Sequence, residues 1–140
     1  MTAKDYLCEI KSDREYIRQL QARKESLHIS YSGISGIDYS KDKIQSSPVN
    51  TLEQRAWDML ERMREIDDKI VELSLNIDKK LQEIHEIGNS LYSQLLYMRY
   101  AEYKTFEQIA VDLSYDYFYV CRTHGEALRL FTELYLPKTA

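Results

Sequence analysis

The residues best suited to metal or acid–base chemistry are three histidines and two cysteines, and they are scattered along the chain. His28, His85 and His124 fall on three different segments, and no two of them have the H-x-x-x-H spacing that places two imidazoles on one helix face. Cys8 and Cys121 lie far apart, without a C-x-x-C pair. The sequence therefore predicts neither a metal site nor a cofactor, and we expect two thiols that are buried or half-buried.

The sequence also offers no arrangement typical of an active site. Neighbouring acids such as Asp67 and Asp68 have the spacing of a solvated helix face. The chain contains no glycine-rich phosphate loop, no nucleophile elbow and no Cys/His pair at a catalytic spacing. We therefore expect that the protein is not an enzyme.

Residues near the C-terminus are suited to a different task, which is contact with a nucleic acid. Arg122 could form the bidentate hydrogen bonds that arginine makes with guanine in the major groove. Tyr117 and Phe118 could touch a thymine methyl group or a sugar, and Asp116 and Cys121 complete the reading face expected at the start of the same helix. Phosphate contacts are expected from three further residues: Arg99, Tyr103 and Lys104.

The charge of the chain does not favour nucleic-acid binding. The net charge is −4, and residues 91–140 hold five lysines and arginines against six acidic residues, which gives −1. Adjacent aromatics on a helix cannot all face inward, so at least one of Tyr117, Phe118 and Tyr119 is expected to be exposed. Exposed aromatics with little positive charge nearby are typical of protein contacts, which leaves a protein partner as an alternative to DNA.

The elements that must position these residues are expected to be helices, because only 4 of the 140 residues are glycine and 2 are proline. A first helix is predicted over residues 3–26. Its apolar stripe is interrupted by Arg14 and Lys24. The stripe consists of Leu7, Ile10, Ile17 and Leu20, with Tyr6 and Tyr16 beside it.

A serine- and glycine-rich stretch, residues 28–50, is expected to be a flexible linker. A long helix is then predicted over residues 51–87, opened by a capping box of Thr51 and Gln54. Only Lys80 interrupts its coiled-coil-like seam, which Trp57, Leu60 and Leu81 widen. The seam consists of Met59, Met63, Ile66, Ile70, Leu73, Ile77, Ile84 and Ile87. We expect this helix to pair with the first as a hairpin, and to join a second copy in a homodimer.

The residues "IGNS" at 87–90 predict a domain boundary, with Gly88 ending one helix and Asn89 or Ser90 beginning the next. Residues 1–88 would form the oligomerisation region and residues 89–140 a three-helix module with helices at 90–101, 105–113 and 116–134. Thr105 and Gln108 predict a second capping box. Ser114 stands in the predicted turn where glycine is common, so it must adopt a strained torsion or the turn must differ.

At these residues the chain resembles a known family. "LLYMRY…KTFEQIAVDLSY…YVCRTHGEAL" is similar to the last helix-turn-helix region of sigma factors and, more closely, to RinA/ArpU-type late transcription regulators of phages and prophages. The resemblance implies a sigma-like helix-turn-helix that binds DNA, with RNA polymerase as a further partner. It is specific over residues 91–131, and Cys121 and Thr123 depart from the family pattern. The resemblance also implies that the protein is located in the cytoplasm of a bacterial host cell.

Two other functions stay open. The module could be a scaffold for protein binding, as an inhibitor of a host nucleic-acid-binding or defence complex, or the chain could be a small terminase-like packaging protein. No segment contains the roughly 18 apolar residues of a membrane span, and "MTAKDYLCEIKSD" lacks the apolar run of a signal peptide. We therefore expect a soluble, intracellular protein without a membrane partner.

Overall fold

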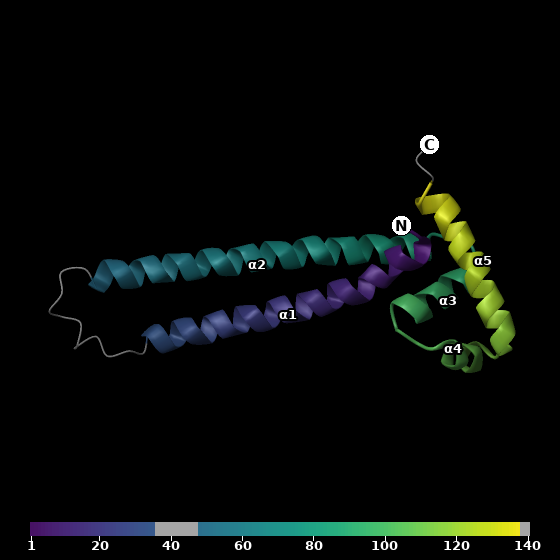
Figure 1. Cartoon of the computed structure of the whole chain (residues 1–140), viewed down its shortest axis with the longest axis horizontal. Helices are drawn as coiled ribbons and strands as arrows, with labels where there is room; N and C mark the ends of the chain where they lie inside the picture. Colours follow the sequence, from purple (N-terminus) through teal and green to yellow (C-terminus); the bar gives the residue numbers. More distant parts are fainter. Residues whose placement is uncertain (36–47, 138–140) are drawn as a thin grey trace. The chain divides into compact units, whose positions relative to one another are not determined.

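The computed structural model describes residues 1–35 and 48–137, and their regular elements are all helices (Figure 1). This confirms the expected all-α class for the described residues. By their contacts the residues form two units, Glu15–Leu73 and Met1–Arg14 with Ser74–Ala140. The helices are α1 (Ala3–Ser35), α2 (Pro48–His85), α3 (Ser90–Tyr100), α4 (Phe106–Leu113) and α5 (Tyr117–Tyr135).

Helix α1 is longer than its sequence predicts, since it runs to Ser35 rather than ending at residue 26. Leu27, just past the expected end, packs against a buried apolar cluster. Adding residues to an existing helix costs much less than starting one, so the helix continues through serines and a glycine that discourage it locally. Residues 28–35 of the expected linker are therefore helical, while residues 36–47 lie outside the described residues.

Helix α2 begins at Pro48, before the expected start. Proline suits the first position of a helix because the N–H that it lacks would have no partner there. Thr51 consequently lies inside the helix, so the predicted Thr51–Gln54 capping box is wrong, and residues 48–50 of the expected linker are also helical. The Gln54 side-chain amide donates instead to a carboxylate oxygen of Asp58 at 3.0 Å.

Within the unit Glu15–Leu73, α1 and α2 pack through apolar side chains at helical spacing. An ion pair of 2.8 Å joins Lys24 Nζ to Asp67 Oδ1, so the lysine that interrupts the predicted stripe has a partner across the two helices. Trp57 and Leu60 do not widen the buried stripe as expected, because they remain 63% and 54% exposed. The buried residues are Leu20, Ile66 and Leu73, with Ile17, Leu27 and Ile70 packed against them.

In the other unit, the first turns of α1 pack against the end of α2 around a buried lysine. Lys80, which interrupts the predicted seam, is only 5% exposed, and its Nζ lies 2.6 Å from Oε2 of Glu9. The same ammonium lies 4.5 Å from the centre of the Tyr6 ring, and the Tyr6 hydroxyl donates to Glu83. The seam therefore continues through a polar contact at this position.

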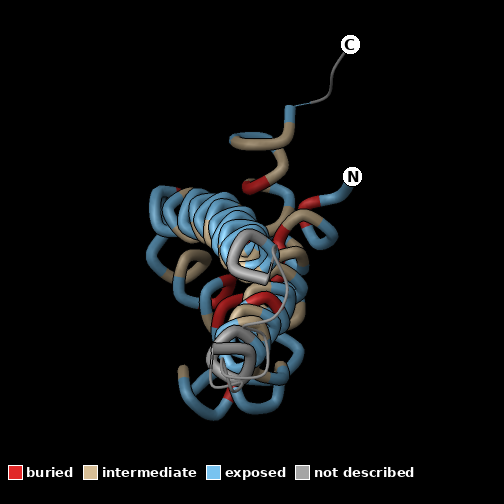
Figure 2. The backbone as a smooth tube through the Cα atoms, turned by 90° about the vertical axis from the view of Figure 1, so that its left-hand side faces the viewer, coloured by how far each residue is buried: buried red, intermediate tan, exposed pale blue. Residues whose placement is uncertain are grey.

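Helices α3, α4 and α5 contact one another and share a core of buried residues, coloured red in Figure 2. Their starts follow the predicted caps. Asn89 accepts from the N–H of Tyr92, and Thr105 forms the predicted capping box with Gln108. Such caps each contribute about 1 kcal/mol. The core consists of Leu95, Ile109, Ala110 and Val120, with Met98, Phe106 and Leu113 packed against it.

Candidate nucleic-acid interface

A short turn directs α5 away from α4. Ser114 ends α4 in the left-handed conformation, with φ 59° and ψ 40°, so the strained torsion expected there is present. The N–H of Tyr115 donates to the carbonyl oxygen of Ala110 at 3.0 Å and closes the end of the helix. Ala110 and Val120 are buried on the two sides of the turn. Because both anchors sit in one core, the turn fixes the direction in which α5 starts.

Asp116 caps α5 and is not free to read a base. Its carboxylate accepts hydrogen bonds from the backbone N–H groups of Phe118 at 3.0 Å and Tyr119 at 3.4 Å. A carboxylate also interacts favourably with the positive end of the helix dipole. In the structure, Asp116 therefore holds the first turn of α5 as its N-cap.

The aromatic residues at the start of α5 are exposed, as predicted for at least one of them. Phe118 is 72% exposed, and Tyr117 and Tyr119 are exposed beside it. Their rings contact neighbouring aromatics, with 5.4 Å between the centres of Tyr117 and Phe118 and 5.0 Å between those of Tyr115 and Tyr119. The start of α5 thus presents two pairs of exposed aromatic rings.

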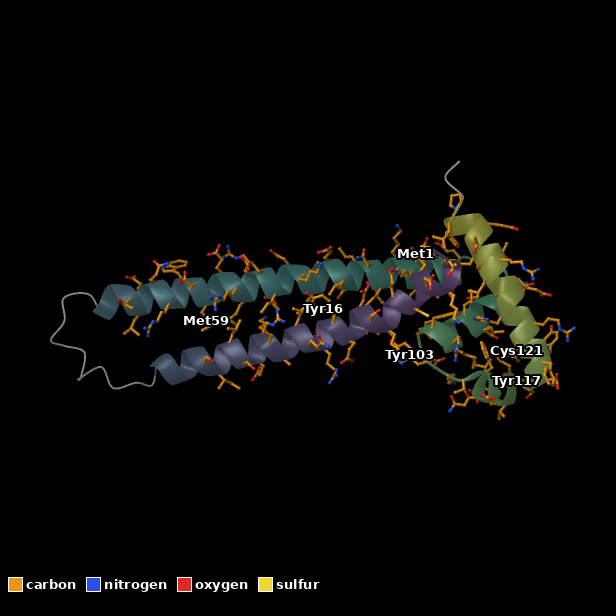
Figure 3. All side chains as sticks on the ribbon, in the orientation of Figure 1. Met1, Tyr16, Met59, Tyr103, Tyr117 and Cys121 are labelled. Carbon is orange, nitrogen blue, oxygen red and sulfur yellow. The ribbon has the colours of Figure 1, made fainter. Side chains whose placement is uncertain are left out.

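Arg122 and Cys121 lie one turn further along α5. Arg122 is exposed, and within the described part of the chain its guanidinium makes no ion pair or hydrogen bond. Cys121 is half-buried and forms a hydrogen bond with Tyr117, which raises the pKa of the Tyr117 phenol. Figure 3 shows Tyr117 and Cys121 at the same end of α5. Of the predicted reading residues, Arg122 is therefore the one whose donors are available.

The residues expected to hold phosphates are already engaged within the chain. Lys104 Nζ lies 2.7 Å from Oδ2 of Asp112, and this ion pair raises the pKa of Lys104. Arg99 donates to the carbonyl oxygen of Lys104 at 3.0 Å, and its guanidinium lies 4.4 Å from the centre of the Phe106 ring. A phosphate contact by Lys104 would have to compete with Asp112, while Arg99 fixes the segment between α3 and α4.

Helix α4 contributes surface that the sequence reasoning did not single out. Val111 is 77% exposed and lines a shallow hollow of about 370 Å³ together with Glu107 and Asp112. Glu107 lies close enough to Tyr117 to raise its pKa further. The helical period could have revealed Val111, because Ile109, Ala110 and Leu113 define the inward face and Val111 falls outside it.

Behind this surface, His124 is a packed core residue. Its Nε2 lies 2.8 Å from the Tyr100 hydroxyl oxygen, and its ring meets Phe106 edge-on with 4.9 Å between centres. Burial, with Arg99 and Lys4 nearby, lowers the pKa of His124 to about 4. His28 and His85 are exposed, and the described residues contain no group of three His, Cys, Asp or Glu placed to hold a metal ion.

Comparison of the chain with family models, with curated proteins and with solved structures finds no significant match. Among the described residues, no helix combines the length and apolar character that crossing a membrane requires.

Proposed function

We propose that the chain is a phage or prophage transcriptional regulator that binds DNA through a sigma-like helix-turn-helix formed by α4 and α5. The observation that carries the proposal is the division of α5 into two faces over its first turns. Val120 and Thr123 are buried, whereas Phe118 and Arg122 are exposed together. A recognition helix needs this division, since its opening residues enter the major groove while the opposite face holds it on the module.

The exposed side chains supply the matching chemistry. Arg122 has free donors for the two acceptors that guanine presents in the major groove, and Phe118 offers an apolar surface for a thymine methyl group. Lys104 would add a phosphate contact after release from Asp112. RNA polymerase is a natural second partner for a sigma-like module, through the surface that DNA leaves uncovered.

A homodimer would present two copies of each cationic contact to one duplex, which a single module of unfavourable charge cannot do. Trp57 and Leu60 form an apolar patch on α2 that the unit Glu15–Leu73 leaves exposed. Covering both with the same patch of a second copy would remove them from water, in the manner of a two-fold interface. Two Arg122 side chains would then act on one duplex. We propose this helical pair, a coiled-coil-like hairpin, as the oligomerisation region.

A second candidate, a protein-binding scaffold, is favoured by the surface of α4 and the start of α5. Phe118 and Val111 are the most exposed apolar residues there, and the acids Glu107 and Asp112 lie on the same helix as Val111. An apolar patch beside acids suits a basic protein partner, such as a component of a host nucleic-acid-binding or defence complex.

Binding to random-sequence DNA duplexes followed by selection tests the first proposal. We expect affinity that falls steeply with salt, because phosphate contacts release counterions. Arg122→Ala should reduce discrimination between selected sites by about 1–3 kcal/mol. Arg129 is an exposed arginine further along α5, so Arg129→Ala is the matched control and should leave the discrimination between sites unchanged.

The same experiment can also exclude DNA binding and point to the protein-binding scaffold. If no duplex binds at low salt, DNA binding is excluded, and a host-protein partner retained by the wild type but lost with Phe118→Ala would support the scaffold instead. Mass photometry separates a dimer from the ring that a terminase-like packaging protein would form.

A further inference from the structure

An open pocket of about 390 Å³ lies between the first turns of α1 and the helices α3–α5, entirely within the unit Met1–Arg14 with Ser74–Ala140. This volume falls in the range of roughly 300–1,000 Å³ that is typical of small-molecule sites. Helix α1 contributes Lys4, Cys8 and Lys11, and the remaining walls come from α3, α4, α5 and the segment after α3. None of these residues belongs to the reading face at the start of α5.

The pocket is positively charged in a chain of net charge −4. Lys4, Lys11 and Arg99 line it, and none of its lining residues is an aspartate or glutamate. Within the described residues, Lys4 and Lys11 are exposed and have no ion-pair partner. Cations gathered around a concave surface whose lining contains no acid attract an anion.

The inner walls of the pocket are aromatic. Phe106, Tyr100 and His124 form one packed group, in which the rings of Tyr100 and His124 stack with 5.7 Å between centres. Because the pKa of His124 is lowered to about 4, its ring is neutral at physiological pH. The pocket therefore pairs cations contributed by α1 with an uncharged aromatic wall, which suits a flat ring better than a small inorganic ion.

Backbone strain at the same place is an independent sign of a binding site. Tyr103, which Figure 3 labels, lines the pocket and has φ 60°, a conformation that a bulky residue rarely adopts. Arg14 holds it there, donating to the Tyr103 hydroxyl at 3.0 Å and to the Ala101 carbonyl oxygen at 2.7 Å. Lys11 lies 5.5 Å from the centre of the Tyr103 ring. Such backbone strain is concentrated at functional sites, ligand sites among them.

We propose that this pocket binds a small molecule that carries a flat aromatic ring and an anionic group, either phosphate or carboxylate. The ring lies against Phe106 and Tyr103, and the anionic group lies between Lys4 and Lys11. The site is separate from the reading face, so this inference does not rest on DNA binding.

Calorimetric titration of the full chain tests the ligand class. The probes are adenosine monophosphate and 4-hydroxybenzoate, with adenosine, 4-hydroxybenzamide and inorganic phosphate as controls. At least one aromatic anion should bind at one site per chain, about tenfold or more tighter than its neutral counterpart and than inorganic phosphate. The tighter of the two identifies phosphate or carboxylate as the anionic group. Failure of both anions to bind, or equal binding of inorganic phosphate, overturns the proposal.

Substitutions locate the site. The double variant Lys4→Ala with Lys11→Ala removes two exposed side chains, so it should keep the melting temperature and lose about tenfold or more in ligand affinity. Lys79→Ala, an exposed lysine on α2, is the matched control and should bind normally. Affinity unchanged in the double variant would overturn the assignment.

Cys8 provides a second measurement that does not depend on the variants. Bound ligand should slow alkylation of the Cys8 thiol, which lines the pocket, and leave Cys121 unaffected. Binding without protection of Cys8 would place the ligand elsewhere and overturn the proposal. Both measurements are made without DNA, so their failure is distinguishable from a failure of the proposed function.

Discussion

The hydroxyl oxygen of Tyr100 lies 2.8 Å from Nε2 of His124, and this hydrogen bond joins α3 to α5 behind the aromatic pocket. Both groups are held in their neutral forms, since burial raises the pKa of Tyr100 to about 12 and lowers that of His124 to about 4. Charging the imidazole in the folded chain is therefore unfavourable, because the proton would create a cation in a buried position near Arg99 and Lys4.

This predicts that stability falls as the pH is lowered. Above the unfolded pKa of His124, 6.5, both states are neutral and the stability is fully present. Between pH 6.5 and about 4 the unfolded chain binds a proton that the folded chain does not, so the free energy of unfolding decreases. Allowing for water in the open pocket, we expect a loss of about 1–2 kcal/mol between pH 7.5 and 5.

Urea unfolding at the two pH values measures this loss. His124→Phe is the control, because it removes the titrating group and should flatten the dependence over this range. A wild-type chain equally stable at both pH values would contradict the assignment.

Under the proposed function, removing the partner of Lys104 should strengthen DNA binding. Asp112→Asn releases the ammonium from its 2.7 Å ion pair, so DNA affinity should rise about two- to fivefold, and the salt dependence should steepen by roughly one counterion. Lys104→Ala should weaken all sites alike. Filter binding at several salt concentrations measures the DNA affinity of both variants. If neither variant changes the affinity, Lys104 does not contact a phosphate.

The carboxylate of Asp116 is expected to stabilise the folded chain by capping the N-terminus of α5. Asp116→Ala should lower the free energy of unfolding by about 1 kcal/mol, while Asp116→Asn, which can still accept the two backbone hydrogen bonds, should lose much less. Thermal unfolding followed by circular dichroism compares them. Equal losses in the two variants would show that the charge, rather than the cap, stabilises α5.

Ser114 provides a direct test of the turn. Ser114→Gly should increase the free energy of unfolding by about 0.5–1 kcal/mol, because glycine adopts positive φ without the penalty of a side chain. Ser114→Ala cannot relieve the torsion and should give no such gain. Destabilisation by glycine in urea unfolding would mean that the turn is not left-handed at this residue.

For the ion pair between Glu9 and the buried Lys80, we expect that removing the acid destabilises the fold more than removing the lysine. Glu9→Gln leaves a buried ammonium without its counter-charge and should cost about 1–3 kcal/mol, a range reduced because Glu9 is partly exposed. Lys80→Met removes that charge and restores the apolar seam, so it should be nearly neutral. If the two variants were equally destabilising in urea unfolding, the desolvation argument would not hold.

Local chemistry made much of the helical framework predictable. Asn89, Thr105 and Asp116 identify helix starts because a short polar side chain can satisfy backbone N–H groups there. The periodicity of Ile109, Ala110 and Val120 identified their core. The sequence does not predict the start of α2, because the serine-rich neighbours of Pro48 indicate a linker although proline is favoured at the first position of a helix.

Positions that depend on contacts between distant segments could not be predicted. Arg14, Lys24 and Lys80 each interrupt an apolar stripe in the sequence, yet each has a partner elsewhere in the chain: Ala101 and Tyr103, Asp67, and Glu9. The cationic pocket has the same origin, since it joins Lys4 and Lys11 to aromatics about a hundred residues later in the sequence. Spacing along one helix carries no information about such pairs.

The exposed position of Trp57 has a practical consequence, because it is the one tryptophan of the chain. Indole fluorescence therefore reports on the surface of α2 alone, whereas the 12 tyrosines are distributed over the chain. Self-association through this patch would take the indole out of water and shift its emission to shorter wavelength. The emission of Trp57 would thus report directly on the proposed self-association, without an added fluorophore.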